Sequence, residues 1–215
     1  IVFVALIFIF LLREGVSAAK IKFVGNIMID SLLENLPNAR SSGTLDQFDI
    51  EPGRFVYVTL HRPSNVDDRD NLATLMAALK DVSQRMPVIF PVHPRTRKML
   101  TEFHLMPQTD SRLRLLDPLG YHASLCLTEN ARAVLTDSGG LQEEATYFRT
   151  PCLTLRPNTE RPITVTLGSN RLTKLERLLA DIGDVFAGPE RIGQVPPLWD
   201  GHTAERALRE LIAAS

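Results

Sequence analysis

The chain has 215 residues, a formal net charge of −1 at pH 7 and a hydrophobic content of 44%, which together are typical of a globular protein. The length suits one domain with a substantial core, and the near-neutral charge offers no basic field that would attract nucleic acid. Cys126 and Cys152 are the two cysteines, and both lie in apolar runs, so we expect buried free thiols in a cytoplasmic protein. Because the sequence contains no metal-binding or dinucleotide motif, we predict no metal site and no cofactor.

Residues 1–10 form a fully apolar run, which Leu11 and Leu12 extend to twelve residues. A membrane-spanning helix needs about 20 apolar residues, and a signal peptide has a basic start and a small-residue cleavage site. The run shows neither pattern. A buried strand, or sequence that derives from a damaged reading frame, is therefore favoured over a membrane segment.

Short apolar runs alternate with longer amphipathic runs along the rest of the chain. We predict a strand at residues 21–24, a helix at residues 26–36 and a linker or loop in the polar stretch 38–53. Further strands are predicted at residues 55–60, 88–92, 113–116, 133–136 and 152–155. Further helices are predicted at residues 69–85, 95–103, 122–130, 141–148, 163–167, 171–182 and 202–214. This alternation is typical of an α/β fold, with a Rossmann-like parallel sheet flanked by helices.

The turn Ser138-Gly139-Gly140 separates a predicted strand from a predicted helix. Such a turn offers unpaired backbone N–H groups and the positive end of a helix dipole, and its two glycines leave the approach open. We therefore expect a diphosphate to bind here, with Ser138 as an additional hydroxyl donor. Glu143 and Glu144 are expected in the first helical turn, where they only complement the helix dipole, or where one of them accepts hydrogen bonds from a ribose.

Polar residues also follow two other predicted strands. Arg161 precedes Pro162, which suits the first position of a helix, so the guanidinium could hold a phosphate at that helix end. The alternative is a surface arginine that pairs with Glu160 or with another carboxylate. His61 follows the strand at residues 55–60, and we expect it to contact substrate rather than to play a structural role. All these groups follow parallel strands, whose carboxyl ends form the ligand-binding edge of open α/β sheets.

Four motifs occur in the order in which the non-hydrolysing UDP-N-acetylglucosamine 2-epimerases carry them. They are Thr59-Leu60-His61-Arg62-Pro63-Ser64-Asn65-Val66-Asp67, Pro91-Val92-His93-Pro94, Asp137-Ser138-Gly139-Gly140-Leu141-Gln142-Glu143-Glu144-Ala145 and Thr159-Glu160-Arg161-Pro162. The chain therefore resembles the C-terminal half of this family over roughly residues 11–185.

The resemblance implies the C-terminal domain of a GT-B fold, with the N-terminal domain largely missing. Residues 1–37 would be a remnant of the N-terminal domain and the crossover, and residues 38–53 a linker or loop. Residues 54–215 would be a Rossmann-like UDP-binding domain with a C-terminal tail helix. The implied partners are a UDP-sugar substrate and, in the full-length enzyme, a second copy of the chain in a homodimer, with no role for nucleic acid or a membrane.

The resemblance also implies roles for single residues. Contacts to UDP would come from Ser138, Gly139, Gly140, Glu144, Arg161 and Tyr121. Among these, Glu144 would hold the ribose and Tyr121 would line the uracil pocket, although Ser124 stands where the family usually has an aromatic residue. His61 would face the phosphate and the reacting centre as the catalytic residue of this half.

The implied reaction converts UDP-N-acetylglucosamine to UDP-N-acetylmannosamine by elimination and re-addition of UDP. The departing diphosphate needs electrostatic stabilisation, and carboxylates are needed to move the proton. In the family those carboxylates lie in the N-terminal domain, so we expect this chain to be inactive alone. Two alternatives stay open. One is another GT-B nucleotide-sugar enzyme, such as a glycosyltransferase or a hydrolysing epimerase, and the other is a UDP-binding remnant without catalysis.

Overall fold

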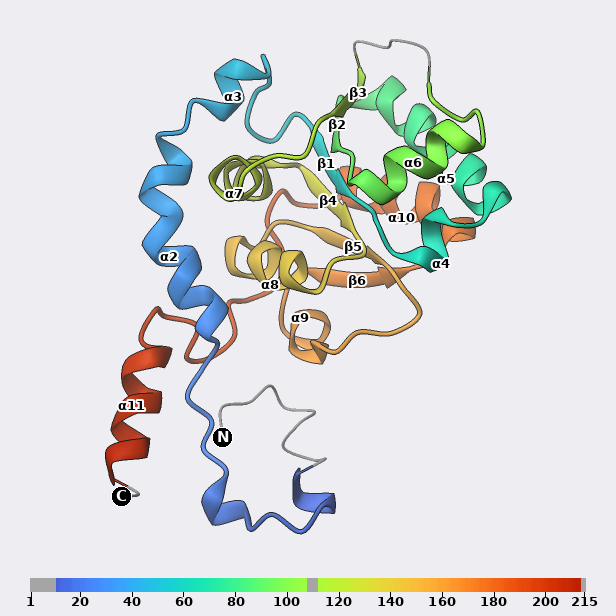
Figure 1. Ribbon diagram of the computed structural model, residues 1–215. Helices are drawn as coiled ribbons and strands as arrows, with labels where there is room; N and C mark the ends of the chain where they lie inside the picture. The colour runs from blue at the N-terminus through green and yellow to red at the C-terminus, as the bar shows by residue number, and fades with distance from the viewer. Residues whose placement is uncertain (1–10, 108–111, 214–215) are drawn as a thin grey trace.

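The computed structural model describes residues 11–107 and 112–213. Within this part of the chain, six parallel strands form one sheet in the order β3-β2-β1-β4-β5-β6 (Figure 1). The strands are β1 (Val56–Thr59), β2 (Val88–Pro91), β3 (Leu113–Leu116), β4 (Ala133–Thr136), β5 (Cys152–Leu155) and β6 (Asn170–Thr173). The predicted fold class, a Rossmann-like α/β sheet, is confirmed.

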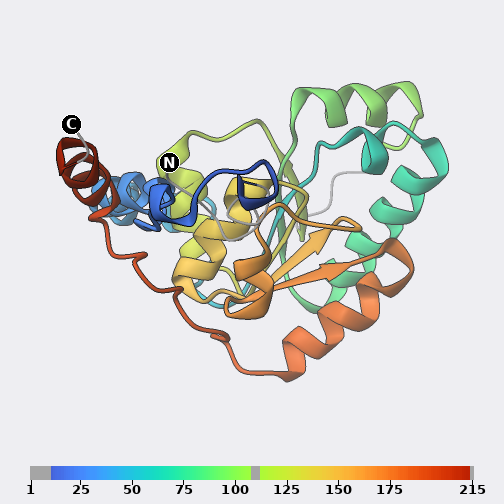
Figure 2. The same ribbon diagram turned by 90° about the horizontal axis from the view of Figure 1, so that it is seen from below.

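Helices cover both faces of the sheet, as Figure 2 shows from below. One face carries α5 (Arg69–Arg85), α6 (Pro94–Glu102) and α10 (Leu178–Ala187). The other face carries α7 (Tyr121–Asn130) and α8 (Gly139–Phe148), and α2 (Ile27–Arg40) packs on these two from outside. The sheet is therefore buried on both sides, which explains why its central strands are almost continuously apolar.

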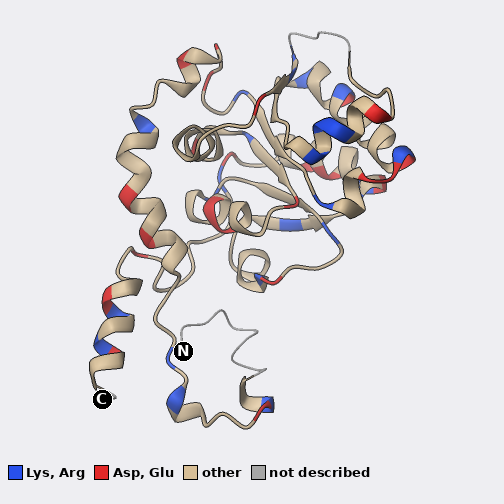
Figure 3. Cartoon of the chain, viewed as in Figure 1, with Lys and Arg blue, Asp and Glu red and all other residues tan. Residues whose placement is uncertain are grey.

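Shorter elements connect these layers. They are η1 (Ala18–Lys20), α3 (Thr44–Gln47), α4 (Pro63–Val66), α9 (Pro162–Thr166) and η2 (Leu175–Arg177). The last helix, α11 (Thr203–Ala213), lies beside α2 on the side away from the sheet (Figure 1). Acidic and basic residues are interspersed along the chain (Figure 3).

Strand β1 shows how the sequence divides the core into two parts. Val56 and Val58 pack in the cluster that contains α5, whereas Phe55 and Tyr57 pack in the cluster that contains α7 and α8. Successive side chains of a strand point to opposite faces, so this alternation follows from the strand geometry. The predicted burial of Cys126 and Cys152 as free thiols is confirmed, and burial raises the pKa of both groups.

The stretch between α10 and α11 forms neither helix nor strand, but hydrogen bonds tie it to the body of the protein. The N–H of Ile192 donates to the carbonyl oxygen of Arg149 at 3.0 Å, and the N–H of Gln194 donates to that of Leu167 at 2.8 Å. Trp199, which is 5% exposed, packs in a cluster with α2. Trp199 therefore anchors this stretch against α2.

The prediction of a helix at residues 171–182 is wrong at its start. Strand β6 occupies the first part, followed by η2 and α10. Among the described strands, β6 lies at the edge and pairs with β5 alone. Its residues Asn170, Arg171 and Thr173 are polar, so no apolar run marks it. The buried amide of Asn170 is instead satisfied by the side chains of Thr154 and Gln142.

The predicted strand at residues 21–24 is also wrong, because this segment pairs with no described strand. Ile21 and Val24 are buried outside the sheet, and the carbonyl oxygen of Val24 accepts a hydrogen bond from Arg206 of α11 at 2.9 Å. The predicted loop at residues 38–53 contains the end of α2 and the whole of α3. The apolar residues 1–10 lie outside the described residues, within which no helix could cross a membrane.

Candidate functional site

The candidate site lies at the carboxyl ends of β1, β4 and β5. Strands β1 and β4 are neighbours in the sheet although β2 and β3 separate them in sequence, because the chain crosses to the other side of β1 after β3. Thr59 and Thr136, the last residues of these two strands, pair with each other in register. Open α/β sheets bind ligands at such a topological switch point.

The first turn of α8 is open. Ser138 is the N-cap residue, but its side chain makes no capping hydrogen bond, so the N–H groups of the first turn have no side-chain partner at the cap. A Cβ atom on Gly140 would meet nothing within 4 Å, whereas one on Gly139 would lie 2.7 Å from Nη1 of Arg161. Gly140 thus leaves space for a ligand, and Gly139 leaves space for the arginine.

Arg161 occupies the N-cap position of α9, and its guanidinium lies over Gly139. Its Nε atom is 3.1 Å from Oε2 of Glu143, and its Nη1 atom is 3.7 Å from Glu160. The arginine side chain is 30% exposed. The structure therefore brings the predicted arginine to the predicted glycine turn, where it adds a positive charge to the helix dipole.

Glu160 belongs mainly to another arginine. Both terminal nitrogens of Arg156 donate to its carboxylate, at 2.8 and 2.7 Å. This forked hydrogen bond lowers the pKa of Glu160 to about 2. Arg161 thus pairs with carboxylates, as the alternative for this residue expected, and its shorter contact is to Glu143 rather than to Glu160.

Glu143 and Glu144 do not lie in the first turn of the helix, because α8 begins at Gly139 and its first turn contains no acidic residue. Both are buried, at 3% and 9% exposure. The pKa of Glu144 is raised to about 7, mainly by burial and also by the charge of Glu143, while a hydrogen bond with the Tyr121 hydroxyl group opposes the shift. The helix dipole does not explain these carboxylates, because it acts mainly on groups in the first turn.

Tyr121 begins α7 and is 42% exposed beside Glu144. Ser124, one turn further on, forms a hydrogen bond of 2.8 Å with the buried hydroxyl group of Tyr57 from β1. The position where an aromatic residue was expected is thus occupied by a polar contact to the sheet. The structure places Tyr121 beside Glu144 and a serine, not an aromatic ring, at residue 124.

His61 lies at the start of the loop after β1 and is held by Asp137, which follows β4. The Nδ1 atom of His61 is 3.1 Å from the carboxylate of Asp137, which is fully buried. The same carboxylate accepts hydrogen bonds from the main-chain N–H groups of His61 and Arg62 and from the side chain of Asn65, at 3.0, 2.8 and 3.0 Å. Because Nδ1 faces Asp137, the other ring nitrogen of His61 remains for a ligand.

Sequence reasoning missed the roles of Asp137 and Arg62 in this site, and it considered Glu143 as a helix-dipole or ribose partner but not as the partner of Arg161. Arg62 donates from Nε to the main-chain oxygen of Asp137 at 2.9 Å, and Glu143 contacts Arg161. A signal for Asp137 exists in the sequence, since an acidic residue directly after a buried strand must find donors. For Glu143 there is no such signal, because burial of one glutamate of a pair depends on how the helix packs.

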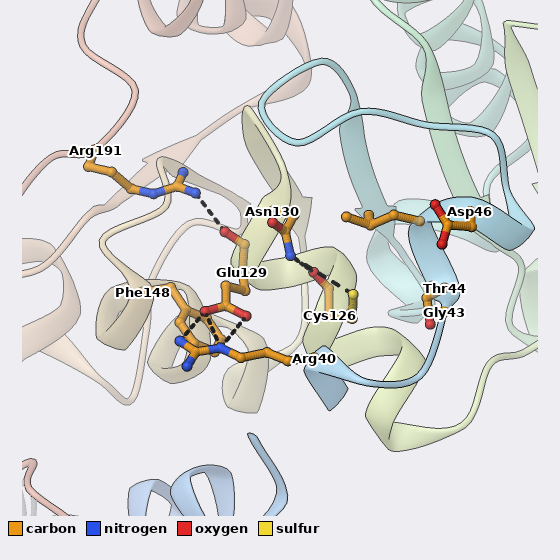
Figure 4. Close-up of a pocket in the computed structure, with 10 residues that line it drawn as sticks. Arg40, Gly43, Thr44, Asp46, Cys126, Glu129, Asn130, Phe148 and Arg191 are labelled. Carbon is orange, nitrogen blue, oxygen red and sulfur yellow. Dashed lines mark hydrogen bonds and ion pairs between the residues drawn. The ribbon is translucent and has the colours of Figure 1, made fainter. Parts of the chain in front are cut away.

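A separate cavity of about 580 Å³ lies near the carboxyl-terminal ends of α2 and α7 (Figure 4). Arg40 donates from Nε to Glu129 at 3.0 Å, and Arg191 donates to the main-chain oxygen of Glu129 at 2.6 Å. Both cationic side chains are thus engaged by protein groups. Among the described residues, no group of three His, Cys, Asp or Glu side chains could hold a metal ion.

With this geometry established, comparison with known proteins assigns a family. The family model of UDP-N-acetylglucosamine 2-epimerase matches residues 9–212. The chain belongs to the UDP-N-acetylglucosamine 2-epimerase family. Its predicted resemblance to these epimerases is confirmed.

Two relatives in this epimerase family illustrate the extent of the match. The chain is 37% identical to the UDP-N-acetylglucosamine 2-epimerase of Methanocaldococcus jannaschii over 210 residues, which are 94% of this chain and 57% of that protein. It is 39% identical to that of Methanococcus maripaludis over 169 residues, which are 75% of this chain and 46% of that protein. The chain therefore spans about half the length of the curated relatives it matches.

Solved structures of the epimerase family agree with the fold. The crystal structure of the M. jannaschii UDP-GlcNAc 2-epimerase in complex with UDP-GlcNAc and UDP matches with a TM-score of 0.80 and 35% identity. The match covers 94% of this chain and 57% of that chain. A heptosyltransferase from Escherichia coli matches at a TM-score of 0.51 and 13% identity, which shows a shared fold alone.

Proposed function

We propose that the chain binds UDP at the carboxyl edge of its sheet and supplies the leaving-group site of a UDP-N-acetylglucosamine 2-epimerase. The observation that carries the proposal is the open first turn of α8 with Arg161 over Gly139. Main-chain donors, the positive end of a helix dipole and a guanidinium converge there, as a diphosphate requires. The complex of the M. jannaschii relative with UDP-GlcNAc and UDP supports this choice of ligand.

Each predicted residue has a role in this proposal. Ser138, Gly139 and Gly140 contact the diphosphate together with Arg161. Glu144 accepts hydrogen bonds from the ribose hydroxyl groups, and Tyr121, which lies beside Glu144, lines the uracil pocket. The 42% exposure of Tyr121 leaves its ring available to a base.

The reaction removes the proton from C2 of the sugar, and the bond between C1 and the diphosphate oxygen breaks. UDP departs with the bonding electron pair, and its re-addition is accompanied by protonation of C2 on the opposite face. Negative charge therefore develops on the diphosphate in the transition state. The N–H groups of α8, Arg161 and His61, which Asp137 orients, stabilise that charge.

The carboxylates at this edge are already engaged. Asp137 accepts several hydrogen bonds, and Glu143 faces Arg161. We therefore propose that groups outside the described residues move the proton at C2, and that the chain alone binds UDP without turnover. A homodimeric full-length enzyme and a cytoplasmic location belong to the same proposal and rest on the family resemblance.

Calorimetric titration of the chain with UDP tests the proposal. Arg161→Ala is expected to weaken UDP binding by about 10- to 100-fold, because a charge-assisted hydrogen bond contributes about 1.5–3 kcal/mol. Arg209→Ala is the matched control, because Arg209 lies on α11 with 72% of its side chain exposed. This variant should bind UDP with the affinity of the wild type. A folded wild-type chain that does not bind UDP would contradict the proposal.

A further inference from the structure

Glu143 is a buried carboxylate with two partners from distant parts of the chain. Its Oε1 atom accepts a hydrogen bond of 3.0 Å from the side-chain amide of Asn26, and its Oε2 atom faces Nε of Arg161 at 3.1 Å. Asn26 is the N-cap of α2, where its own oxygen accepts from the N–H of Met28. One side chain therefore joins the start of α2, the middle of α8 and the arginine of the diphosphate site.

The charge of Glu143 needs this arrangement. An ionised carboxylate at 3% exposure is costly unless a cation or hydrogen bonds compensate it, and Arg161 supplies the opposite charge. In return, the contact holds the Nε side of the guanidinium. The Nη1 side of the same group then lies over Gly139, beside the open N–H groups of α8.

The contact between the two groups is close but not aligned. Nε of Arg161 and Oε2 of Glu143 are both buried, and neither has a hydrogen-bond partner with good geometry within residues 11–107 and 112–213. Glu160 is a second carboxylate within reach of the guanidinium, at 3.7 Å, and is more exposed. Without Glu143 we expect Arg161 to turn towards Glu160 and away from Gly139.

We infer that Glu143 is a positioning residue, which keeps Arg161 over the diphosphate site and ties that site to α2. The inference rests on the proposed function, because it concerns the same diphosphate. Glu143 does not contact the ligand. Its negative charge would by itself weaken diphosphate binding and raise the pKa of Glu144, so a net gain in affinity from Glu143 can come only through Arg161.

A double-mutant cycle tests this inference with two ligands, UDP and uridine. Glu143→Gln keeps the acceptor for Asn26 but presents an amide that cannot balance the charge of Arg161. It is expected to weaken UDP binding about fivefold to tenfold and to leave uridine binding unchanged or tighter, because uridine carries no phosphate. In the Arg161→Ala background, the same substitution should cause no further loss of UDP affinity.

Two further variants keep the test decisive. Glu210→Gln is the matched carboxylate control, because Glu210 lies on α11 with 48% of its side chain exposed, and the affinity of this variant for UDP should stay within about twofold of the wild type. Asn26→Ser keeps a capping side chain on α2 but removes the amide that donates to Glu143. It should weaken UDP binding more than uridine binding, which gives a second measurement if Glu143→Gln does not fold.

The outcomes separate this inference from the proposed function. If the wild type binds UDP and Arg161→Ala weakens it, but Glu143→Gln binds UDP as well as the wild type or better, only the inference is overturned. Equal losses of UDP and uridine affinity, in both backgrounds, would show a merely structural role and would also overturn it. If a folded wild-type chain does not bind UDP, both are overturned.

Discussion

The carboxyl group of Glu144 lies where the proposed ribose contact meets the protein interior. Its pKa of about 7, raised first by burial and then by Glu143, leaves it partly protonated at neutral pH. Ribose hydroxyl groups that donate hydrogen bonds would stabilise the ionised form. Binding of UDP would therefore release a proton, and protonation of Glu144 at lower pH would oppose binding.

We expect the affinity for UDP to fall as the pH decreases from about 8 to 6, by up to about tenfold for each pH unit below the pKa of Glu144. The phosphate of UDP itself ionises near pH 6, as phosphate monoesters do. The Glu144→Gln variant has no titrating group at this position, so the pH dependence of its affinity measures the contribution of the UDP phosphate. Calorimetric titrations across this pH range measure the UDP affinity of the wild type and of the variant. If the two affinities depend on pH in the same way, Glu144 is excluded as the titrating group.

The main-chain framework of the proposed site could be predicted from sequence. The strand, the glycine turn and the helix around Ser138 are local features, so their geometry follows from a few adjacent residues. The pairing of His61 with Asp137 and of Asn26 with Glu143 joins residues 76 and 117 positions apart. Such pairs depend on how strands and helices pack, which a single sequence does not reveal.

Within helix α8, the two adjacent glycines of the first turn differ in the space that surrounds them. Both lie in the first turn of the helix, and neither has a positive φ angle. A side chain on Gly139 would collide with Arg161, whereas one on Gly140 would extend into open space. The first glycine is needed for the protein's own packing, and the second is needed only if a ligand approaches.

Gly140→Ala is therefore expected to raise the free energy of unfolding of the ligand-free protein by about 0.5–1 kcal/mol, because alanine favours the helix. Gly139→Ala should raise the free energy of unfolding by less, because the new methyl group displaces Arg161, and it should weaken UDP binding about tenfold. Urea unfolding and UDP titration of both variants measure these effects. An equal gain in stability for the two variants would show that Arg161 is not fixed over Gly139.

The elements that sequence reasoning placed well are those with a strong apolar pattern. Helix α5 has the predicted bounds, and the strands β1 to β5 were all expected. The edge strand β6 was not, because its buried groups are polar and satisfied by side chains such as Thr154. The opposite error occurred at residues 21–24, where a strand was predicted. Its apolar residues are buried, but no neighbouring strand pairs with them.

At the scale of the whole molecule, one sheet edge gathers loops from widely separated parts of the chain. The order β3-β2-β1-β4-β5-β6 places the loops after β1, β4 and β5 side by side. This convergence could be anticipated because parallel strands present their carboxyl ends on one edge. The contact of α2 with this edge could not, because it depends on the capping residue Asn26 and the buried Glu143.

The irregular stretch between α10 and α11 has a consequence for the dynamics of the molecule. Its lack of regular structure would suggest rapid amide hydrogen exchange, but Ile192 and Gln194 donate to carbonyl oxygens of the body of the protein. We expect these two amides to exchange with solvent deuterium at least about 100-fold more slowly than that of Gly193, which is exposed and has no described acceptor.

Hydrogen exchange followed by NMR resolves these amides individually, and uniformly fast exchange along the stretch would contradict the expectation. Slow exchange would mean that the segment opens only together with the ends of α8 and α9, whose carbonyl oxygens it holds. The segment between α10 and α11 would then be a rigid connection, and α11 would move together with the sheet rather than reorient independently.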